Sequence, residues 1–292
     1  MIADLVRLSR PKHWIKNVFT FLPVPFALAS GAHLDVVRFA YGVAALCLAA
    51  SAVYAFNDAQ DAERDRMHEE KKHRPIAAGR ISKGVAYVWA TGLIAIGAGL
   101  SMLADGFGSG QYGVLTIYAL YVVMNLAYSF GAKHVTLLDV FLLSAMYVLR
   151  VLLGCALLRV EASHWLLLCS GGLALFVALA KRRADVVKGH GAAHRPALEG
   201  YNESFRDQAI GIAACLTIIA YALYSKEATV LEPSRKFAAL PFVVFAVLDY
   251  LRNVHVNRSG GSPVDSLLRS PTLIFAGIGW LAATLLSLRW GG

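Results

Sequence analysis

The stretch "VVRFAYGVAALCLAASAVYAFNDAQDAERD", residues 36–65, joins an apolar run to a row of carboxylates with no turn signal between them. The apolar part, Val36 to Phe56, is close to the roughly 20 residues that a helix needs to cross a bilayer. Asp58, Asp61 and Asp65 follow with the spacing i, i+3, i+7, which places all three on one side of a continuing helix. The stretch therefore predicts a membrane helix that ends in a carboxylate face.

Long apolar blocks of this kind fill most of the chain. Hydrophobic residues make up 57% of the 292 positions and charged residues only 16%, whereas soluble proteins carry about 25% charged residues. Backbone amides in lipid need internal partners, so each block should be a helix. We therefore predict an all-α polytopic membrane protein, a bundle of about nine transmembrane helices forming one domain over residues 1–292. The nine blocks are Val18 to Ser30, Val36 to Phe56, Val85 to Leu103, Tyr112 to Phe130, Val135 to Leu158, Trp165 to Ala180, Ile210 to Tyr224, Phe237 to Tyr250 and Thr272 to Leu288.

The basic residues sort to one side of these blocks. The formal net charge is +9. The positions of the basic residues indicate the membrane orientation, because cytoplasmic loops are enriched in Lys and Arg. With nine spans, the block ends on one side of the membrane carry the basic residues of Arg7 to Lys16, Arg64 to Lys83, Lys133, Lys181 to Arg206 and Arg252 to Arg269. The block ends on the other side carry little more than Arg38, Arg159, Lys226, Arg235, Lys236 and Arg289. We expect a cytoplasmic N-terminus and a polar cap facing the cytoplasm from the inner (cytoplasmic) membrane, and no nucleic-acid partner.

The carboxylate face favours a bound cation. Asn57 falls within the same arc as the three aspartates, and His68 would join them if the helix persisted that far. Oxygen-only ligands suit Mg²⁺, which usually shares its coordination shell with substrate phosphates. The bases that follow, including Lys71 and Arg74, would supply positive charge for an anionic ligand. The alternative is a solvated helix end on which these acids and bases simply pair.

The pattern N-D-x-x-D-x-x-x-D after an apolar block, residues 57–65, resembles the first aspartate motif of the UbiA superfamily of intramembrane prenyltransferases. That resemblance implies a nine-helix bundle, with the motif holding Mg²⁺ and the diphosphate of the donor. Typical members carry a second D-x-x-x-D motif after the sixth span. The corresponding loop here, "KRRADVVKGHGAAHRPALEGY" (181–201), has Asp185 followed four residues later by Gly189 and is dominated by bases.

Other segments resemble one branch of that superfamily, the decaprenyl-phosphate phosphoribosyltransferases. They are "RPKHWIKN" (10–17), "DRMHEEKKHRPIAAG" (65–79), "AYSFGAKHVTLLDV" (127–140), "YVLRVLLG" (147–154) and "ALAKRRADV" (178–186). The departures are mild: His13 and Lys72 are unusual for the branch, Glu69 stands where proline is usual, and Asp185 replaces a glutamate. The resemblance implies transfer of 5-phosphoribose from phosphoribosyl diphosphate (PRPP) to a polyprenyl phosphate, with release of pyrophosphate.

Roles for individual residues follow from charge and location. Mg²⁺ on Asp58, Asp61 and Asp65 would neutralise the leaving diphosphate. The lipid phosphate, already an anion, would attack the anomeric carbon from the opposite side without a general base. Phosphate-binding candidates are Lys16, Lys133 and Arg150 for the lipid, Lys181 and Arg182 for the 5-phosphate, and Tyr128, Asp185 and Arg195 as further contacts; the two phosphate sites remain interchangeable at this point.

Three alternatives stay open. The first is prenyl transfer from an allylic diphosphate to an aromatic or other small acceptor, against which the missing second acidic motif argues. The second is a transporter, which would place ionisable groups near the membrane midplane, where only Arg150 is expected. The third concerns single residues: Arg150, Lys12 and Lys16 would serve only as anchors at the membrane interface. The sequence leaves the lipid length and the oligomeric state, including a homo-oligomer, undecided.

Overall fold

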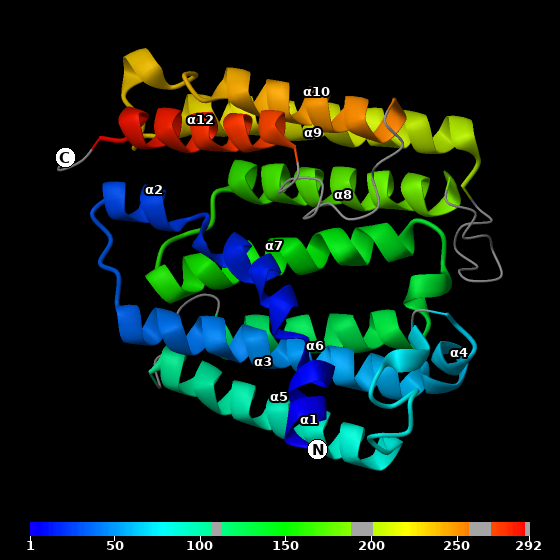
Figure 1. Cartoon of the computed structure of the whole chain (residues 1–292). Coiled ribbons are helices and arrows are strands. Elements are labelled where there is room, and N and C mark those ends of the chain that lie inside the picture. Colours follow the sequence, from blue (N-terminus) through cyan, green and yellow to red (C-terminus); the bar gives the residue numbers. More distant parts are fainter. Residues whose placement is uncertain (70, 107–112, 188–200, 257–269, 290–292) are drawn as a thin grey trace. The chain divides into compact units, whose positions relative to one another are not determined.

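The computed structural model describes residues 1–69, 71–106, 113–187, 201–256 and 270–289, the side chains of 185–187 excepted. Within these ranges the regular secondary structure is helical (Figure 1), apart from one isolated bridge between Leu231 and Leu288, and turns and irregular segments connect the helices. The all-α prediction is confirmed. The elements are α1 (Ile2–Ser9), η1 (Pro11–Phe21), α2 (Val24–Ala29), α3 (Val36–Gln60), α4 (Ala62–Arg66), η2 (Lys71–His73), α5 (Lys83–Asp105), α6 (Val114–Phe130), η3 (Ala132–His134), α7 (Leu138–Leu158), α8 (His164–Val187), α9 (Glu203–Glu227), η5 (Pro233–Arg235), α10 (Leu240–His255) and α12 (Pro271–Ser287).

Six segments of the described chain are long and apolar enough to cross a membrane, so the protein is a multi-pass membrane protein. They are Val36–Gln60, Lys83–Asp105, Leu138–Leu158, His164–Ala184, Glu203–Glu227 and Pro233–His255. Two shorter apolar helices, α6 and α12, match the fourth and ninth predicted blocks. The first predicted block is not a continuous helix, because η1 ends at Phe21 and α2 begins at Val24. Pro23 and Pro25 lie at this break, and proline both lacks an amide donor and restricts the preceding residue.

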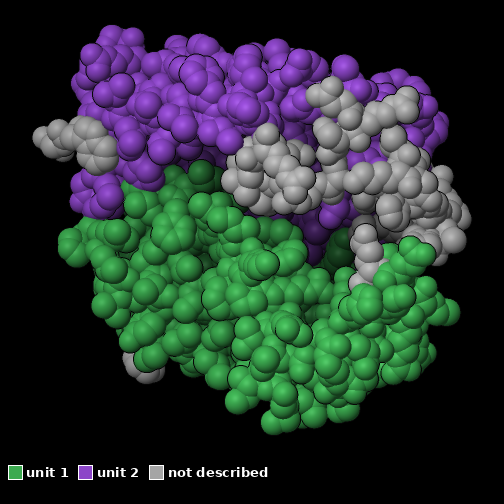
Figure 2. Space-filling view, viewed as in Figure 1, with its two compact units in different colours: residues 1–24, 33–129, 149–161 green, residues 25–32, 130–148, 162–292 purple. Residues whose placement is uncertain are grey.

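The residues fall into two compact units, which Figure 2 colours separately. Unit 1 comprises Met1–Val24, His33–Ser129 and Leu149–Glu161, and unit 2 comprises Pro25–Ala32, Phe130–Val148 and Ala162–Gly292. Neither unit is one continuous segment, and α7 contributes residues to both. The single domain predicted from the sequence stays a prediction.

Unit 1 is built around α3. Asp35 caps this helix by accepting a hydrogen bond from the Arg38 amide at 3.0 Å. Its face toward α5 is a row of alanines, and small residues let membrane helices approach closely. Those almost fully buried alanines are Ala52, Ala55 and Ala59 on α3, with Ala86 and Ala90 on α5. The same unit tolerates no side chain at Gly154, where a Cβ would lie 2.1 Å from the Thr20 carbonyl oxygen of η1.

Unit 2 packs α8, α9, α10 and α12 against one another. Its core contains Phe176, whose ring meets that of Tyr250 edge-on with centroids 5.4 Å apart. Gly172 of α8 lies against Thr217 of α9, whose hydroxyl would be 3.1 Å from an added Cβ. The C-terminal part of α8, which carries the predicted site residues Lys181, Arg182 and Asp185, is therefore held on a packed helical scaffold.

Candidate active site

The three aspartates lie at the junction of α3 and α4. Helix α3 ends at Gln60, Asp61 links the two helices, and the Asp65 amide donates to the Asp61 carbonyl oxygen at 2.8 Å. Helical geometry therefore continues almost unbroken through Asp61. It stops at Arg66, so the helix does not continue far enough to bring His68 onto the same face. The His68 amide instead donates to the Asp65 carbonyl oxygen at 3.2 Å in a turn.

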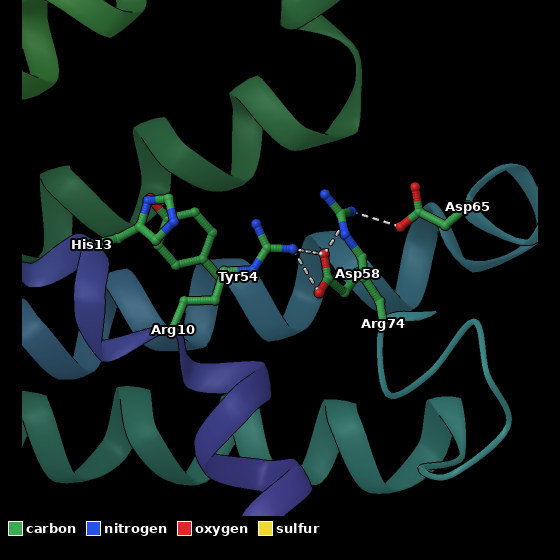
Figure 3. A network of polar contacts seen from close by, with 6 residues as sticks. All are labelled: Arg10, His13, Tyr54, Asp58, Asp65 and Arg74. Atoms are coloured by element: carbon green, nitrogen blue, oxygen red, sulfur yellow. Dashed lines mark hydrogen bonds and ion pairs between the residues drawn. The ribbon is translucent and has the colours of Figure 1, made fainter. Parts of the chain in front are cut away.

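Two of these aspartates share one guanidinium (Figure 3). The Nη1 atom of Arg74 lies 3.1 Å from Oδ1 of Asp58 and 2.6 Å from Oδ2 of Asp65. Both carboxylates are almost fully buried, at 3% and 4% exposure. A buried pair of carboxylates is stable only with a compensating cation, which Arg74 provides from the segment after η2.

Arg10 supplies a second cation to Asp58. Its Nη2 atom donates to both carboxylate oxygens, at 2.5 Å and 2.8 Å, and its guanidinium also covers the Tyr54 ring at 5.1 Å. The backbone of Arg10 is in the left-handed region (φ 47°, ψ 59°), between α1 and η1. Non-glycine residues in this conformation are strained and need support from their surroundings. The ion pair to Asp58 provides such support and fixes where the chain turns.

Arg10 was not predicted as a partner of the aspartates; it was noted only as a basic residue and as the first residue of "RPKHWIKN". The available local signal was Pro11, because a residue before proline is disfavoured in the right-handed helical region and so marks a change of direction. That signal places a turn at Arg10, but it does not say that the side chain returns to Asp58.

This arrangement fits a hard cation. The oxygens of Asp58 and Asp65 already meet at one positively charged nitrogen, so a cation is accommodated between them. The neighbouring Oδ1 of Asn57 is buried and has no hydrogen-bond partner in the described chain. With the arginines in place, the described residues contain no group of three or more His, Cys, Asp or Glu side chains close enough to hold a metal. Metal binding here would therefore require Arg74 to move off at least one carboxylate.

Two further predicted residues of unit 1 lie in polar networks. Arg150 of α7 is 6% exposed; its Nε donates to Asn17 at 3.1 Å, and its Nη2 donates to the Tyr121 hydroxyl at 2.8 Å. The guanidinium also lies over the Tyr121 ring at 5.0 Å. Lys16 of η1 is 3.5 Å from the Tyr54 hydroxyl. The contacts of Arg150 are those of an inward-facing charge rather than of an interfacial anchor.

Lys71 and Tyr128 are the remaining predicted residues of unit 1. Lys71 begins η2, and its carbonyl oxygen accepts from the Arg74 amide at 2.9 Å. Tyr128 lies near the C-terminal end of α6 and is half-buried.

Unit 2 holds Arg182 in a buried network. Its Nε donates to Oδ2 of Asp139 at 2.6 Å, and the two side chains are 1% and 0% exposed. The Tyr201 hydroxyl donates to the other oxygen of Asp139 at 2.9 Å and accepts from the Leu137 amide at 2.8 Å. Burial, reinforced by the Asp139 charge, raises the pKa of Tyr201 to about 12, so this hydroxyl stays protonated as a donor. Asp139 and Tyr201 were not predicted as site residues; the signal was a lone carboxylate at the start of an apolar block.

The other predicted residues of unit 2 are less fully described. Lys133 lies in η3, and Lys181 lies on α8 beside Arg182 with an exposed side chain. Asp185 is also on α8, but its side chain lies outside the described residues, as does the whole of Arg195.

The sequence matches the UbiA prenyltransferase family over residues 17–258, most of its length. The chain belongs to this family. Two relatives cover nearly all of this UbiA-family chain, and both are named decaprenyl-phosphate phosphoribosyltransferase. The one from Corynebacterium glutamicum is 33% identical over 98% of this chain and 87% of its own length. The one from Mycobacterium tuberculosis strain CDC 1551 / Oshkosh is 30% identical over 100% of this chain and 96% of its own length.

Solved structures of the UbiA family agree with the fold. A UbiA homolog from Archaeoglobus fulgidus bound to GPP and Mg²⁺ superposes with a TM-score of 0.73. The alignment covers 96% of this chain and 98% of the other at 17% sequence identity, a similarity that establishes the shared fold. The resemblance read from the aspartate motif is thereby confirmed at the level of family and fold.

Proposed function

We propose that this UbiA-family enzyme transfers the 5-phosphoribosyl group of PRPP to a polyprenyl phosphate and releases pyrophosphate. The observation that carries the proposal is the near full-length similarity to two decaprenyl-phosphate phosphoribosyltransferases. The dominance of bases over acids in residues 181–201 supports it, because PRPP carries a 5-phosphate in addition to its diphosphate. A lipid phosphate acceptor also suits a chain with six membrane-length apolar segments.

Asp58, Asp61 and Asp65, with the Asn57 amide oxygen, are the proposed ligands of Mg²⁺. When bound, Mg²⁺ would neutralise negative charge on the diphosphate as it leaves. Arg10 and Arg74 would exchange their bonds to the carboxylates for bonds to diphosphate oxygens, which guanidinium groups bind well. The two arginines thus keep the acids neutralised in the free enzyme and bind the donor in the complex.

The transfer itself needs one bond made and one broken. An oxygen of the lipid phosphate forms a bond to C1 of the ribose, and the bond from C1 to the diphosphate oxygen breaks. The bonding electrons leave with the pyrophosphate, so no proton has to be removed from the acceptor. Lys16, Lys133 and Arg150 are proposed to bind the lipid phosphate, and Lys181 and Arg182 the 5-phosphate, with Tyr128, Lys71, His68, Asp185 and Arg195 as additional contacts.

The membrane orientation is part of the same proposal. The clustering of bases between alternate spans supports a cytoplasmic N-terminus and a polar cap on the cytoplasmic face of the inner membrane. The remaining span, the first in the chain, would have to be formed by η1 and α2 together, since α3, α5, α6, α7, α8, α9, α10 and α12 match the other eight blocks. PRPP would then reach the carboxylates from the cytoplasm.

A comparison of donors tests the proposal. Purified protein with Mg²⁺ and a polyprenyl phosphate should release pyrophosphate from PRPP, and should not release it from geranyl diphosphate in the presence of aromatic acceptors. The second candidate, prenyl transfer, is supported by the description of the matching family as UbiA prenyltransferases. Pyrophosphate release with the prenyl donor alone would establish that candidate and reject phosphoribosyl transfer.

A further inference from the structure

Arg206 is a buried cation that no described side chain neutralises. It lies in the first turn of α9 and is 6% exposed. Its Nε and Nη1 atoms are buried and have no hydrogen-bond partner in the part of the chain that the structure describes. Arg38 has the same two atoms unpartnered, but it is less buried and its Nη2 donates to the Ala156 carbonyl oxygen at 3.2 Å. Arg206 is therefore the more isolated of the two.

The buried and half-buried carboxylates described at this end of unit 2 are already engaged with other partners. Asp139 bonds Arg182 and Tyr201, Asp207 bonds Arg183 and His255, and Asp249 bonds Arg252 and Thr272. Glu203, one turn before Arg206 on α9, is exposed and makes no described ion pair with it. The positive charge of Arg206 is thus in excess among the described residues.

The position of Arg206 follows from its neighbours on α9. Asp207 is adjacent to it and accepts from Arg183 of α8 at 2.7 Å, which places Arg206 beside the basic C-terminal part of α8. Ile210 and Ala213, at i+4 and i+7 from Arg206, belong to the core of unit 2. Arg206 therefore begins the buried face of α9, close to the level of Arg182 and Arg183.

A guanidinium cannot lose its proton to escape such a site. A buried charge without a partner is unfavourable, and retaining one is understandable where a ligand supplies the counter-charge. The planar donors of arginine match phosphate oxygens in pairs. An anionic phosphate is therefore the chemistry that would complete this part of unit 2.

We propose that Arg206 is a binding residue for a phosphate monoester. The assignment rests on the proposed function, in which both substrates carry such a group: the 5-phosphate of PRPP and the headgroup of the polyprenyl phosphate. Arg206 contributes the cation that binds one of these two groups, in addition to Lys181 and Arg182. Its role is in binding and not in the chemical step.

Thermal unfolding in detergent tests the assignment, with ribose 5-phosphate and farnesyl phosphate as separate probes. The wild-type protein should gain stability with at least one probe. In Arg206→Met the ligand-free Tm should rise, because the uncompensated charge is gone, while Kd for one probe should increase about 10- to 100-fold. The probe that loses affinity identifies which substrate phosphate binds there. Arg206→Lys keeps the charge but not the paired donors, so its Kd for that probe should lie between the values of the wild type and of Arg206→Met.

The matched control is Arg183→Met, the same change on the facing helix at a residue whose partners are described. It should lower the ligand-free Tm, because Asp207 keeps only His255, and it should leave both probe affinities within about twofold. Unchanged affinity for both probes in Arg206→Met, or no stabilisation of the wild type by either probe, would overturn the assignment. PRPP turnover measured on the same samples separates this outcome from a failure of the proposed function, since turnover would persist if only the Arg206 assignment were wrong.

Discussion

Arg74 lies 2.6 Å from Asp65, nine residues earlier in the chain, because the segment after α4 turns back over the end of α3. The same nitrogen also reaches Asp58, so one side chain connects the two buried carboxylates of the aspartate motif. The motif therefore includes its own counter-ion. This relationship leads to the first two predictions.

Replacing the aspartates should remove activity without removing the fold. Asp58→Asn and Asp65→Asn each take away a charged oxygen ligand, and we expect transfer from PRPP to fall at least about 100-fold. Radiolabelled product formation at saturating Mg²⁺ is the measurement. Asp35→Asn is the control, since Asp35 caps the other end of α3 and asparagine caps equally well. Near-normal activity in Asp58→Asn would show that the carboxylates do not carry the reaction.

Arg74 should compete with metal ions in the absence of substrate. Arg74→Ala leaves the oxygens of Asp58 and Asp65 without their shared cation, so Mn²⁺ should bind the substrate-free protein more tightly than it binds the wild type. Electron paramagnetic resonance of free Mn²⁺ measures this affinity directly. The same variant should lose affinity for pyrophosphate, because one guanidinium donor is missing. Weaker Mn²⁺ binding in Arg74→Ala would mean that the arginine supports the metal site instead of occupying it.

The Asp139–Arg182 pair should be strongly coupled in stability. Both side chains are essentially inaccessible to solvent, so Asp139→Leu alone should cost about 3–5 kcal/mol of unfolding free energy. The double variant Asp139→Leu/Arg182→Met should cost less than the sum of the single variants, because no buried charge is left alone. Tyr201→Phe removes only a hydroxyl and should cost about 1–2 kcal/mol. Denaturant unfolding in mixed micelles gives these values, and simple additivity would contradict the network.

Gly154 and Gly99 offer a matched test of packing in unit 1. An alanine Cβ at position 154 would lie 2.1 Å from the Thr20 carbonyl oxygen, whereas at position 99 it would meet nothing within 4 Å. Gly154→Ala should therefore destabilise by about 1–3 kcal/mol through overpacking. Gly99→Ala should be neutral or stabilise by up to about 1 kcal/mol through helix propensity. Equal Tm values for the two variants would show that η1 does not lie against α7 as described.

The sequence predicts the helices better than it predicts their side-chain partners. The run from Val36 to Phe56 and the aspartates after it are read correctly as a helix with an acidic end, because both features are local in the chain. The block from Val18 to Ser30 is not one continuous helix, because two prolines divide it. Apolar length alone does not report such a break.

The site residues show the same limit. Spacing and charge within residues 57–79 select Asp58, Asp65 and Arg74 as candidates, and the structure brings these side chains into contact. Arg10 is 48 residues from Asp58 and Asp139 is 43 residues from Arg182, and nothing local in a single sequence marks those pairings. The unusual backbone at Arg10 likewise depends on the tertiary contact that supports it.

The central claim is that the 5-phosphoribosyl group is transferred to the polyprenyl phosphate, and that neither the diphosphate nor a prenyl group is transferred. PRPP labelled with ¹⁴C in the ribose and with ³²P in the β-phosphate, incubated with the protein, Mg²⁺ and a polyprenyl phosphate, tests it in one measurement. We expect ¹⁴C in the organic extract and ³²P in the aqueous phase as pyrophosphate, and we expect Asp58→Asn to form neither product. Both labels in the organic phase, or ¹⁴C that never leaves the aqueous phase, would contradict it.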